Sequence, residues 1–82
     1  MKKVFMFSAS WCGPCRQAKP VFNQLKESTT GVEFEVVDID ENPVMANNFN
    51  ITGVPSFVVM ENEKEVERLV GGAHVTKLKQ VL

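Results

Sequence analysis

The sequence predicts an α/β protein, a three-layer α/β/α sandwich around a four-stranded mixed sheet, with the element order βαβαββα. Stretches suited to strands alternate along the chain with stretches whose apolar residues recur at helical spacing. An opening strand–helix–strand unit implies a right-handed crossover between parallel strands, and a later polar turn implies an antiparallel hairpin. Since 82 residues suffice for one domain, we expect residues 1–82 to form a single unit.

The first half of the chain contains the parallel unit. Residues 2–8 include four consecutive apolar residues, as expected of a strand covered on both faces. A helix is predicted from Pro14 to about Thr29, because its apolar residues share one face, and Gly31 marks its end. The residues of this apolar face are Cys15, Ala18, Phe22 and Leu25. Residues 32–38 begin with alternating apolar and acidic side chains, which predicts the second strand.

The second half contains a short helix and the hairpin. A proline at position 43, after an asparagine, predicts a helix over residues 43–48. Strands are predicted at residues 56–60 and 65–70, joined by a polar turn at residues 61–64. The charges of the last strand place it at an edge of the sheet. After two glycines comes a final helix whose apolar face consists of Val75, Leu78 and Leu82.

Composition excludes several classes of protein. The net charge of −1 gives no electrostatic reason to bind nucleic acid or an anionic membrane. No apolar stretch approaches the roughly 20 residues of a membrane span. The apolar run near the N-terminus stops after four residues, which is too short for a signal peptide. We therefore expect a cytoplasmic protein without nucleic-acid or membrane partners.

The only two cysteines are separated by two residues, a spacing that suits a metal site, a structural disulfide or redox chemistry. A structural zinc site needs four ligands, and the chain offers only His74 beside Cys12 and Cys15, so two chains would have to share the metal. A disulfide that closes so short a loop constrains the unfolded chain little. Redox chemistry is the favoured interpretation, with no metal and no cofactor beyond the cysteine pair itself.

The predicted helix assigns different roles to the two thiols. Cys12 lies just before the helix, where unpaired N–H groups and the helix dipole favour a thiolate, so we expect it to be an exposed nucleophile. Cys15 lies on the apolar face, so we expect it to be mostly buried and to resolve the mixed disulfide. Gly13 keeps side-chain bulk away from an approaching partner, and Pro14 presets a helical φ near the first turn.

The stretch Trp11–Cys15, which reads Trp-Cys-Gly-Pro-Cys, resembles the signature of the thioredoxin family. This resemblance implies a thioredoxin-like fold and a helix that continues, kinked, through Pro20. It also implies that residues 53–55 form the family's cis-proline loop and residues 72–73 its glycine turn, both beside the cysteines. The substrate-binding residues implied in this way are Trp11, Gly13, Pro14, Val54, Pro55, Gly72 and Ala73.

The resemblance implies an enzyme, a thioredoxin-type protein disulfide reductase that acts as a monomer. Its implied partners are protein disulfides, with ribonucleotide reductase among the candidates, and a flavoprotein thioredoxin reductase or a similar electron donor. A glutathione-dependent glutaredoxin is the nearest alternative, favoured by the small size and the Gly71-Gly72 pair. Glutaredoxins usually differ from this chain between the cysteines and after the glycine pair. A non-catalytic binding subunit is a second alternative, against which the intact cysteine pair argues.

One pair of positions departs from the family. Thioredoxins have a buried aspartate six residues before the first cysteine, and a lysine paired with it, where this chain has Met6 and Val36. Glu35 is adjacent in sequence, but strand alternation points it to the opposite face of the sheet. We therefore expect water or the leaving thiolate to take the proton of Cys15.

Overall fold

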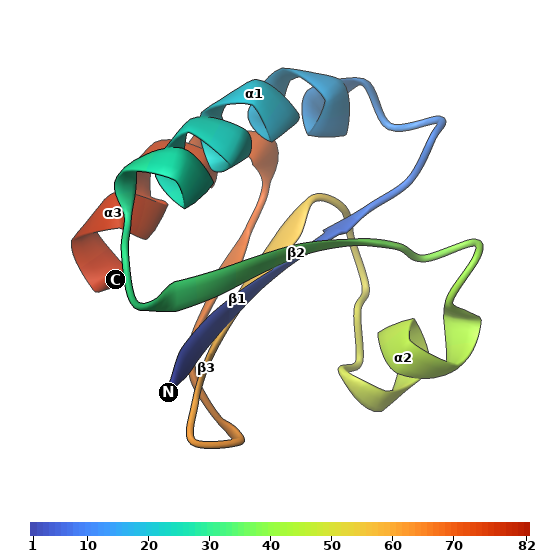
Figure 1. The fold of residues 1–82 in the computed structure, drawn as a ribbon. Helices are drawn as coiled ribbons and strands as arrows, with labels where there is room; N and C mark the ends of the chain where they lie inside the picture. The colour runs from blue at the N-terminus through green and yellow to red at the C-terminus, as the bar shows by residue number, and fades with distance from the viewer.

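A computed structural model describes residues 1–82 and shows the predicted order of elements (Figure 1). The elements are β1 (Lys2–Ser8), α1 (Gly13–Ser28), β2 (Val32–Asp38), α2 (Pro43–Asn48), β3 (Ser56–Glu61), β4 (Lys64–Val70), the 3₁₀ helix η1 (Gly72–Lys77) and α3 (Leu78–Val81). The strands lie in the order β2-β1-β3-β4. As predicted, β1 and β2 are parallel, β3 and β4 form an antiparallel hairpin, and β4 is an edge strand.

The strand β1 is the centre of the fold because it pairs with β2 on one side and, antiparallel, with β3 on the other. Its register with β2 runs from Lys2 opposite Val32 to Ser8 opposite Asp38. Parallel strands end at the same edge of a sheet, so the segments that follow β1 and β2 meet there. This edge carries the loop with the first cysteine.

Apolar side chains form two cores, one on each face of the sheet. The larger core has 13 buried residues and lies between the sheet and α1, η1 and α3. The smaller core has four buried residues, Phe5, Phe7, Val37 and Val58, against which Met45 and Phe49 of the α2 region pack. Figure 1 accordingly shows α1 and α3 on one face and α2 on the other, which confirms the three layers.

The face that carries α2 is only partly covered, since this helix has six residues. A hollow of about 660 Å³ remains beside it, floored by Phe5, Phe49 and Met60. The hollow lies near the start of β1, whereas the cysteines follow the end of that strand. The largest hollow of the molecule is therefore not the site of cysteine chemistry.

The long helix α1 continues through Pro20, so the expectation that it does not end at Lys19 is confirmed. The final helix differs from the prediction, because most of it is the 3₁₀ helix η1 and only four residues are α-helical. Val75 and Thr76 are β-branched and lose side-chain freedom in an α-helix, and no side chain caps the first turn. Val75 and Leu78 are nevertheless buried, as their common apolar face predicts.

Arg68 forms an ion pair within β4 and a hydrogen bond that joins this strand to the end of α2. The Arg68 guanidinium donates hydrogen bonds to both carboxylate oxygens of Glu65, at 2.8 and 2.7 Å, and another to the Phe49 carbonyl oxygen at 2.7 Å. The hydrogen bond from Arg68 lowers the pKa of Glu65, against an opposing effect of desolvation, and the same bond raises the pKa of Arg68.

This pair should make a small, pH-dependent contribution to stability. Because the folded pKa of Glu65 is lowered, the contribution is complete above the unfolded pKa and is lost as the pH falls through the folded one. The carboxyl side chain is 36% exposed, so solvent screening limits the contribution to about 1 kcal/mol or less. Urea unfolding across pH should show that Glu65→Gln loses stability near neutral pH and little in acid. Glu67→Gln is the control, and the same pH profile in both variants would contradict this prediction.

Candidate active site

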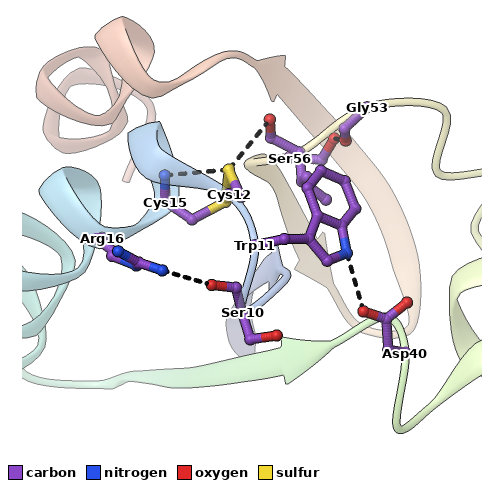
Figure 2. Close-up of a disulfide and its surroundings, with 9 residues drawn as sticks. Ser10, Trp11, Cys12, Cys15, Arg16, Asp40, Gly53 and Ser56 are labelled. Atoms are coloured by element: carbon purple, nitrogen blue, oxygen red, sulfur yellow. Dashed lines mark hydrogen bonds between the residues drawn. A yellow bond between two sulfur atoms is a disulfide. The ribbon is translucent and has the colours of Figure 1, made fainter.

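The two cysteines lie where the loop after β1 enters α1. Cys12 is the N-cap residue of this helix, with extended backbone angles of φ −89° and ψ 110°. The first N–H groups of a helix have no partner within the helix. One of them, the backbone N–H of Cys15, donates to Cys12 Sγ at 3.2 Å, and the two residues form a disulfide (Figure 2). The cap thus places a hydrogen-bond donor against the sulfur of Cys12, which favours its thiolate when the disulfide is reduced.

Both cysteines are buried in the disulfide form. Cys15 is 1% exposed, as its place on the apolar face predicts, but Cys12 is only 3% exposed. The expectation of an exposed Cys12 is therefore wrong for this state. The backbone N–H of Cys12 donates to the Ala9 carbonyl oxygen at 3.1 Å, which folds the loop back, and Cys12 Sγ lies 3.7 Å from the Val54 carbonyl oxygen. These contacts place the sulfur between the loop that follows β1 and the loop of residues 53–55.

The loop of residues 53–55 lies beside Cys12, and its Val54–Pro55 peptide bond is cis, which confirms the expectation. Two hydrogen bonds hold this loop. Ser56 Oγ donates to the Gly53 carbonyl oxygen at 2.5 Å, and the Gly71 N–H donates to the Pro55 carbonyl oxygen at 2.8 Å. The second bond connects the loop to Gly71, which directly precedes the glycine turn at the start of η1.

The glycine turn lies against the first turn of α1. A Cβ atom on Gly72 would lie 3.1 Å from Pro14 Cβ and 3.4 Å from the Pro14 carbonyl oxygen, so the close approach favours glycine. Pro14, Gly72 and Ala73 line a hollow of about 450 Å³. The structure thus brings the two predicted loops to the cysteines. Gly13 is exposed next to them, and a Cβ on it would meet nothing.

Trp11 is 65% exposed, directly before Cys12. Its indole N–H donates to Asp40 Oδ2 at 3.0 Å (Figure 2). No motif in the sequence identifies Asp40, which lies two residues beyond β2. The predicted parallel pairing of the first two strands could have pointed to Asp40, because it brings the turn after β2 to the edge of the sheet where Cys12 lies.

Arg16 has a structural contact near the cysteines, whereas a ring nitrogen of His74 is unpaired. Arg16 donates from Nη2 to the Ser10 carbonyl oxygen at 3.0 Å, which ties the loop before Cys12 to the helix. His74 lies in η1, half-buried, and its Nδ1 has no hydrogen-bond partner. The structure contains no group of three or more His, Cys, Asp or Glu side chains that could hold a metal ion. No helix is long and apolar enough to cross a membrane.

Of the two positions that depart from the family, Met6 lies in the core and Val36 is exposed. Met6 is fully buried in the same cluster as Cys12 and Cys15, and it is paired in register with Val36. Glu35 lies on the opposite face, 3.1 Å from Lys3 Nζ, as strand alternation predicts. The buried polar side chains are Ser8 and Ser56, and no acidic side chain is buried.

Comparison with known proteins settles the family. A sequence model described as Thioredoxin matches residues 2–82. The chain belongs to the thioredoxin family. It is 45% identical over 68 residues to Thioredoxin H2 of Arabidopsis thaliana, an alignment that covers 83% of this chain and 51% of the plant protein. The chain thus spans about half the length of several curated plant thioredoxins that it matches.

Solved thioredoxins have the same fold. Fasciola hepatica thioredoxin superposes with a TM-score of 0.92 at 39% identity, covering 98% of this chain and 76% of the other. Thioredoxin NaTrxh of Nicotiana alata superposes with a TM-score of 0.93 at 38% identity, covering 98% and 69%. The predicted thioredoxin fold is therefore confirmed, and here it carries a redox disulfide between Cys12 and Cys15.

Proposed function

We propose that this thioredoxin reduces protein disulfides, with Cys12 as the nucleophile and Cys15 as the resolving thiol. The observation that carries the proposal is the position of Cys12 Sγ at the N-cap of α1, where it accepts the Cys15 N–H at 3.2 Å and forms a disulfide with Cys15. A sulfur held there is stabilised as the thiolate, which is the form that attacks disulfides.

The reaction has two exchange steps. The Cys12 thiolate attacks one sulfur of the substrate disulfide, which forms a mixed disulfide and releases the other substrate sulfur as a thiolate. Cys15, having lost its proton, then attacks Cys12 Sγ, which forms the Cys12–Cys15 disulfide and releases the second substrate thiolate. Two electrons pass to the substrate, and its two sulfurs take up two protons. Because Met6 replaces the family's aspartate, water or the released thiolate accepts the proton of Cys15.

The proposed substrate surface consists of residues around the buried sulfurs, most of them exposed or partly exposed, although the Pro55 side chain is itself buried. Trp11, Gly13 and Pro14 flank Cys12 in sequence, and the contacts of Val54, Pro55, Gly72 and Ala73 bring their loops to the same place. An electron donor, a flavoprotein thioredoxin reductase or a similar enzyme, would reduce the disulfide again. Protein disulfides such as that of ribonucleotide reductase are candidate substrates. We propose a monomer in a thiol-reducing compartment such as the cytoplasm.

Trapping of the mixed disulfide tests the two roles. A Cys15→Ser variant should retain attack by Cys12 and accumulate a covalent complex with oxidised substrate proteins, which mass spectrometry identifies. The matched Cys12→Ser variant should accumulate none. In the reduced wild-type protein, iodoacetamide should alkylate Cys12 much faster than Cys15, because Cys12 lies at the N-cap, where its thiolate is stabilised, and Cys15 lies inside the helix on its buried face. Equal alkylation rates, or trapping through Cys15, would contradict the assignment.

The electron donor separates this proposal from a glutaredoxin. Insulin reduction should be sustained by NADPH with thioredoxin reductase and not by reduced glutathione alone. The reverse result would identify a glutathione-dependent enzyme. If a protein with both cysteines replaced by serine kept its biological activity, the non-catalytic binding subunit would be the better interpretation.

A further inference from the structure

The strand β2 forms one edge of the sheet, and its outer side has no neighbouring strand. It pairs only with β1, through seven consecutive residues in a register without a shift. Figure 1 shows β2 in the foreground, with no segment drawn in front of it. The backbone N–H and C=O groups that an edge strand directs outward are unpaired, so they form a template for another strand.

The strand β2 lacks the features that usually protect such an edge. Its sequence, Val-Glu-Phe-Glu-Val-Val-Asp, contains no lysine, proline or glycine and is rich in β-branched and aromatic residues. The opposite edge differs, because β4 has a shift in its register with β3 between Val59 and Met60. It also carries Lys64, and its Arg68 donates to the Phe49 carbonyl oxygen at 2.7 Å. Bulges and charges of this kind discourage pairing, so β2 is the edge that is open to a further strand.

The two faces of β2 specify the chemistry of that strand. On the α2 face, the side chains of Glu33 and Glu35 are 53% and 48% exposed, and their carboxylates lie 3.7 and 3.1 Å from Lys3 Nζ. Because two carboxylates share one ammonium group, one negative charge is left without a partner. On the α1 face, Phe34 is buried and Val36 is partly exposed. Opposite charges and apolar pairs stabilise adjacent strands, so a strand with alternating basic and apolar side chains complements both faces.

The distribution of charge over the molecule favours the same partner. Eight of the ten acidic residues lie within residues 27–63, a stretch that contains no lysine or arginine and includes β2, α2 and β3. On the other face of the sheet, α1 carries the exposed cations Arg16, Lys19 and Lys26. Basic side chains of an added strand are therefore attracted to the α2 face and repelled from the α1 face, which determines how the strand is oriented.

We propose that the β2 edge binds an extended segment of a partner protein in which Lys or Arg residues alternate with apolar residues. The added strand pairs its backbone with β2, which provides affinity, and places its basic side chains beside Glu33 and Glu35, which provides specificity. A second copy of this chain fits less well. Antiparallel pairing of two β2 strands gathers four glutamates on one face, with only two Lys3 side chains to offset them. The edge binds without cysteine chemistry, so this inference goes beyond the proposed function and does not depend on it.

Binding of a cysteine-free peptide to the oxidised protein tests the proposal. The probe is acetyl-Lys-Val-Lys-Val-Lys-Val-Lys-amide, and NMR of the backbone amides of the protein measures its binding. The peptide should shift the amide signals of β2 and leave those of β4 nearly unchanged. It should also slow hydrogen exchange of the β2 amides that face outward. The same peptide with every backbone nitrogen methylated keeps the charges but cannot donate ladder hydrogen bonds, and a Glu-Val peptide reverses the charge. Neither control should bind.

Charge variants with matched controls locate the binding site. Glu33→Gln combined with Glu35→Gln should raise the Kd of the peptide about two- to thirtyfold, because two cross-strand ion pairs are lost. Glu61→Gln combined with Glu67→Gln removes the same charge from exposed positions of β3 and β4, away from the β2 edge, and should have little effect. Lys3→Gln should lower the Kd, because it removes the cation that competes for both carboxylates.

Several results would overturn the inference. Unchanged β2 amide signals at millimolar peptide would show that the edge accepts no strand, and binding of the methylated peptide would show that charge alone attracts it. Equal losses of affinity in the two double variants would exclude a specific site. A dimer in sedimentation experiments, or outward β2 amides already protected in the free monomer, would show that a second copy or the chain itself covers the edge. Since the probe has no disulfide, each of these results leaves the proposed function standing.

Discussion

Replacing Met6 with aspartate is expected to destabilise the protein strongly and in a pH-dependent way. Met6 is fully buried in the core that contains Cys15, so the variant loses an apolar side chain and buries a carboxyl group. Loss of a buried methionine alone costs about 2 to 5 kcal/mol. A buried polar group without a partner costs about 1 to 3 kcal/mol more. The variant should therefore be among the least stable single substitutions in the chain.

The pH dependence has a definite sign. Desolvation disfavours the ionised carboxylate, so the folded pKa of an aspartate at position 6 would lie above its unfolded pKa. The folded state then binds more protons between the two values, and stability falls as the pH rises through this window. The destabilisation should be smallest in acid, where both states are protonated, and should level off above the folded pKa. Urea unfolding of both proteins across pH measures this difference.

Two further variants control this experiment. Met6→Leu keeps an apolar side chain of similar volume and should cost less than about 1.5 kcal/mol at every pH. Val36 lies opposite Met6 in register and is 39% exposed, so Val36→Lys can place a cation next to the new carboxylate. The double variant should recover part of the loss at neutral pH and little in acid. A Met6→Asp protein equally stable at every pH would show that position 6 faces water.

The second large effect is expected at Phe22, which holds α1 against the sheet. Its side chain is 1% exposed, and its ring meets Phe34 edge-on at 5.3 Å and Phe57 at 6.1 Å between centroids. Phe22→Ala should lower the free energy of unfolding by about 3 to 5 kcal/mol. Marginal stability of about 0.05 to 0.15 kcal/mol per residue implies a total of only about 4 to 12 kcal/mol for this chain. The variant therefore loses a large share of its stability.

Phe49→Ala is the matched control on the other face. Phe49 also meets two rings, Phe5 at 5.5 Å and Phe7 at 5.4 Å, but it is only half-buried beside the open hollow. Its loss should cost clearly less than that of Phe22. If Phe22→Ala does not fold, Phe22→Leu provides a measurable intermediate. Equal losses of unfolding free energy in Phe22→Ala and Phe49→Ala would contradict the conclusion that the core on the α1 face contributes more to stability than the core on the α2 face.

Most of the fold follows from short-range patterns in the sequence. The four-residue apolar run within residues 2–8 predicts β1, and the spacing from Cys15 to Leu25 predicts both α1 and its buried face. The strand–helix–strand order predicts the parallel pair, because a crossover helix returns the chain to begin the second strand in the same direction as the first. The cis bond before Pro55 is different, since only the family resemblance leads to it.

The remaining features depend on contacts between segments distant in sequence. The burial of Cys12 arises from the Val54 loop, 42 residues away, which no local periodicity reveals. The bond between Trp11 and Asp40 spans 29 residues and needs the register of β1 and β2. The 3₁₀ geometry of η1 reflects weak local preferences near β-branched residues, which a helical pattern of apolar positions does not distinguish from an α-helix.

Because the two cores differ in size, the two faces of the sheet are expected to unfold locally with different free energies. Because α2 has no buried residue of its own, few contacts oppose its release, and the segment can open while the larger core stays folded. Such an opening would disturb Asn42, the N-cap residue of α2. The backbone N–H and the side-chain amide of Asn42 both donate hydrogen bonds to the Asp38 carbonyl oxygen. That carbonyl belongs to the turn that carries Asp40. Local opening of α2 would then determine how long the hydrogen bond between Trp11 and Asp40 persists. Hydrogen exchange of the α2 backbone amides would measure how often this opening occurs.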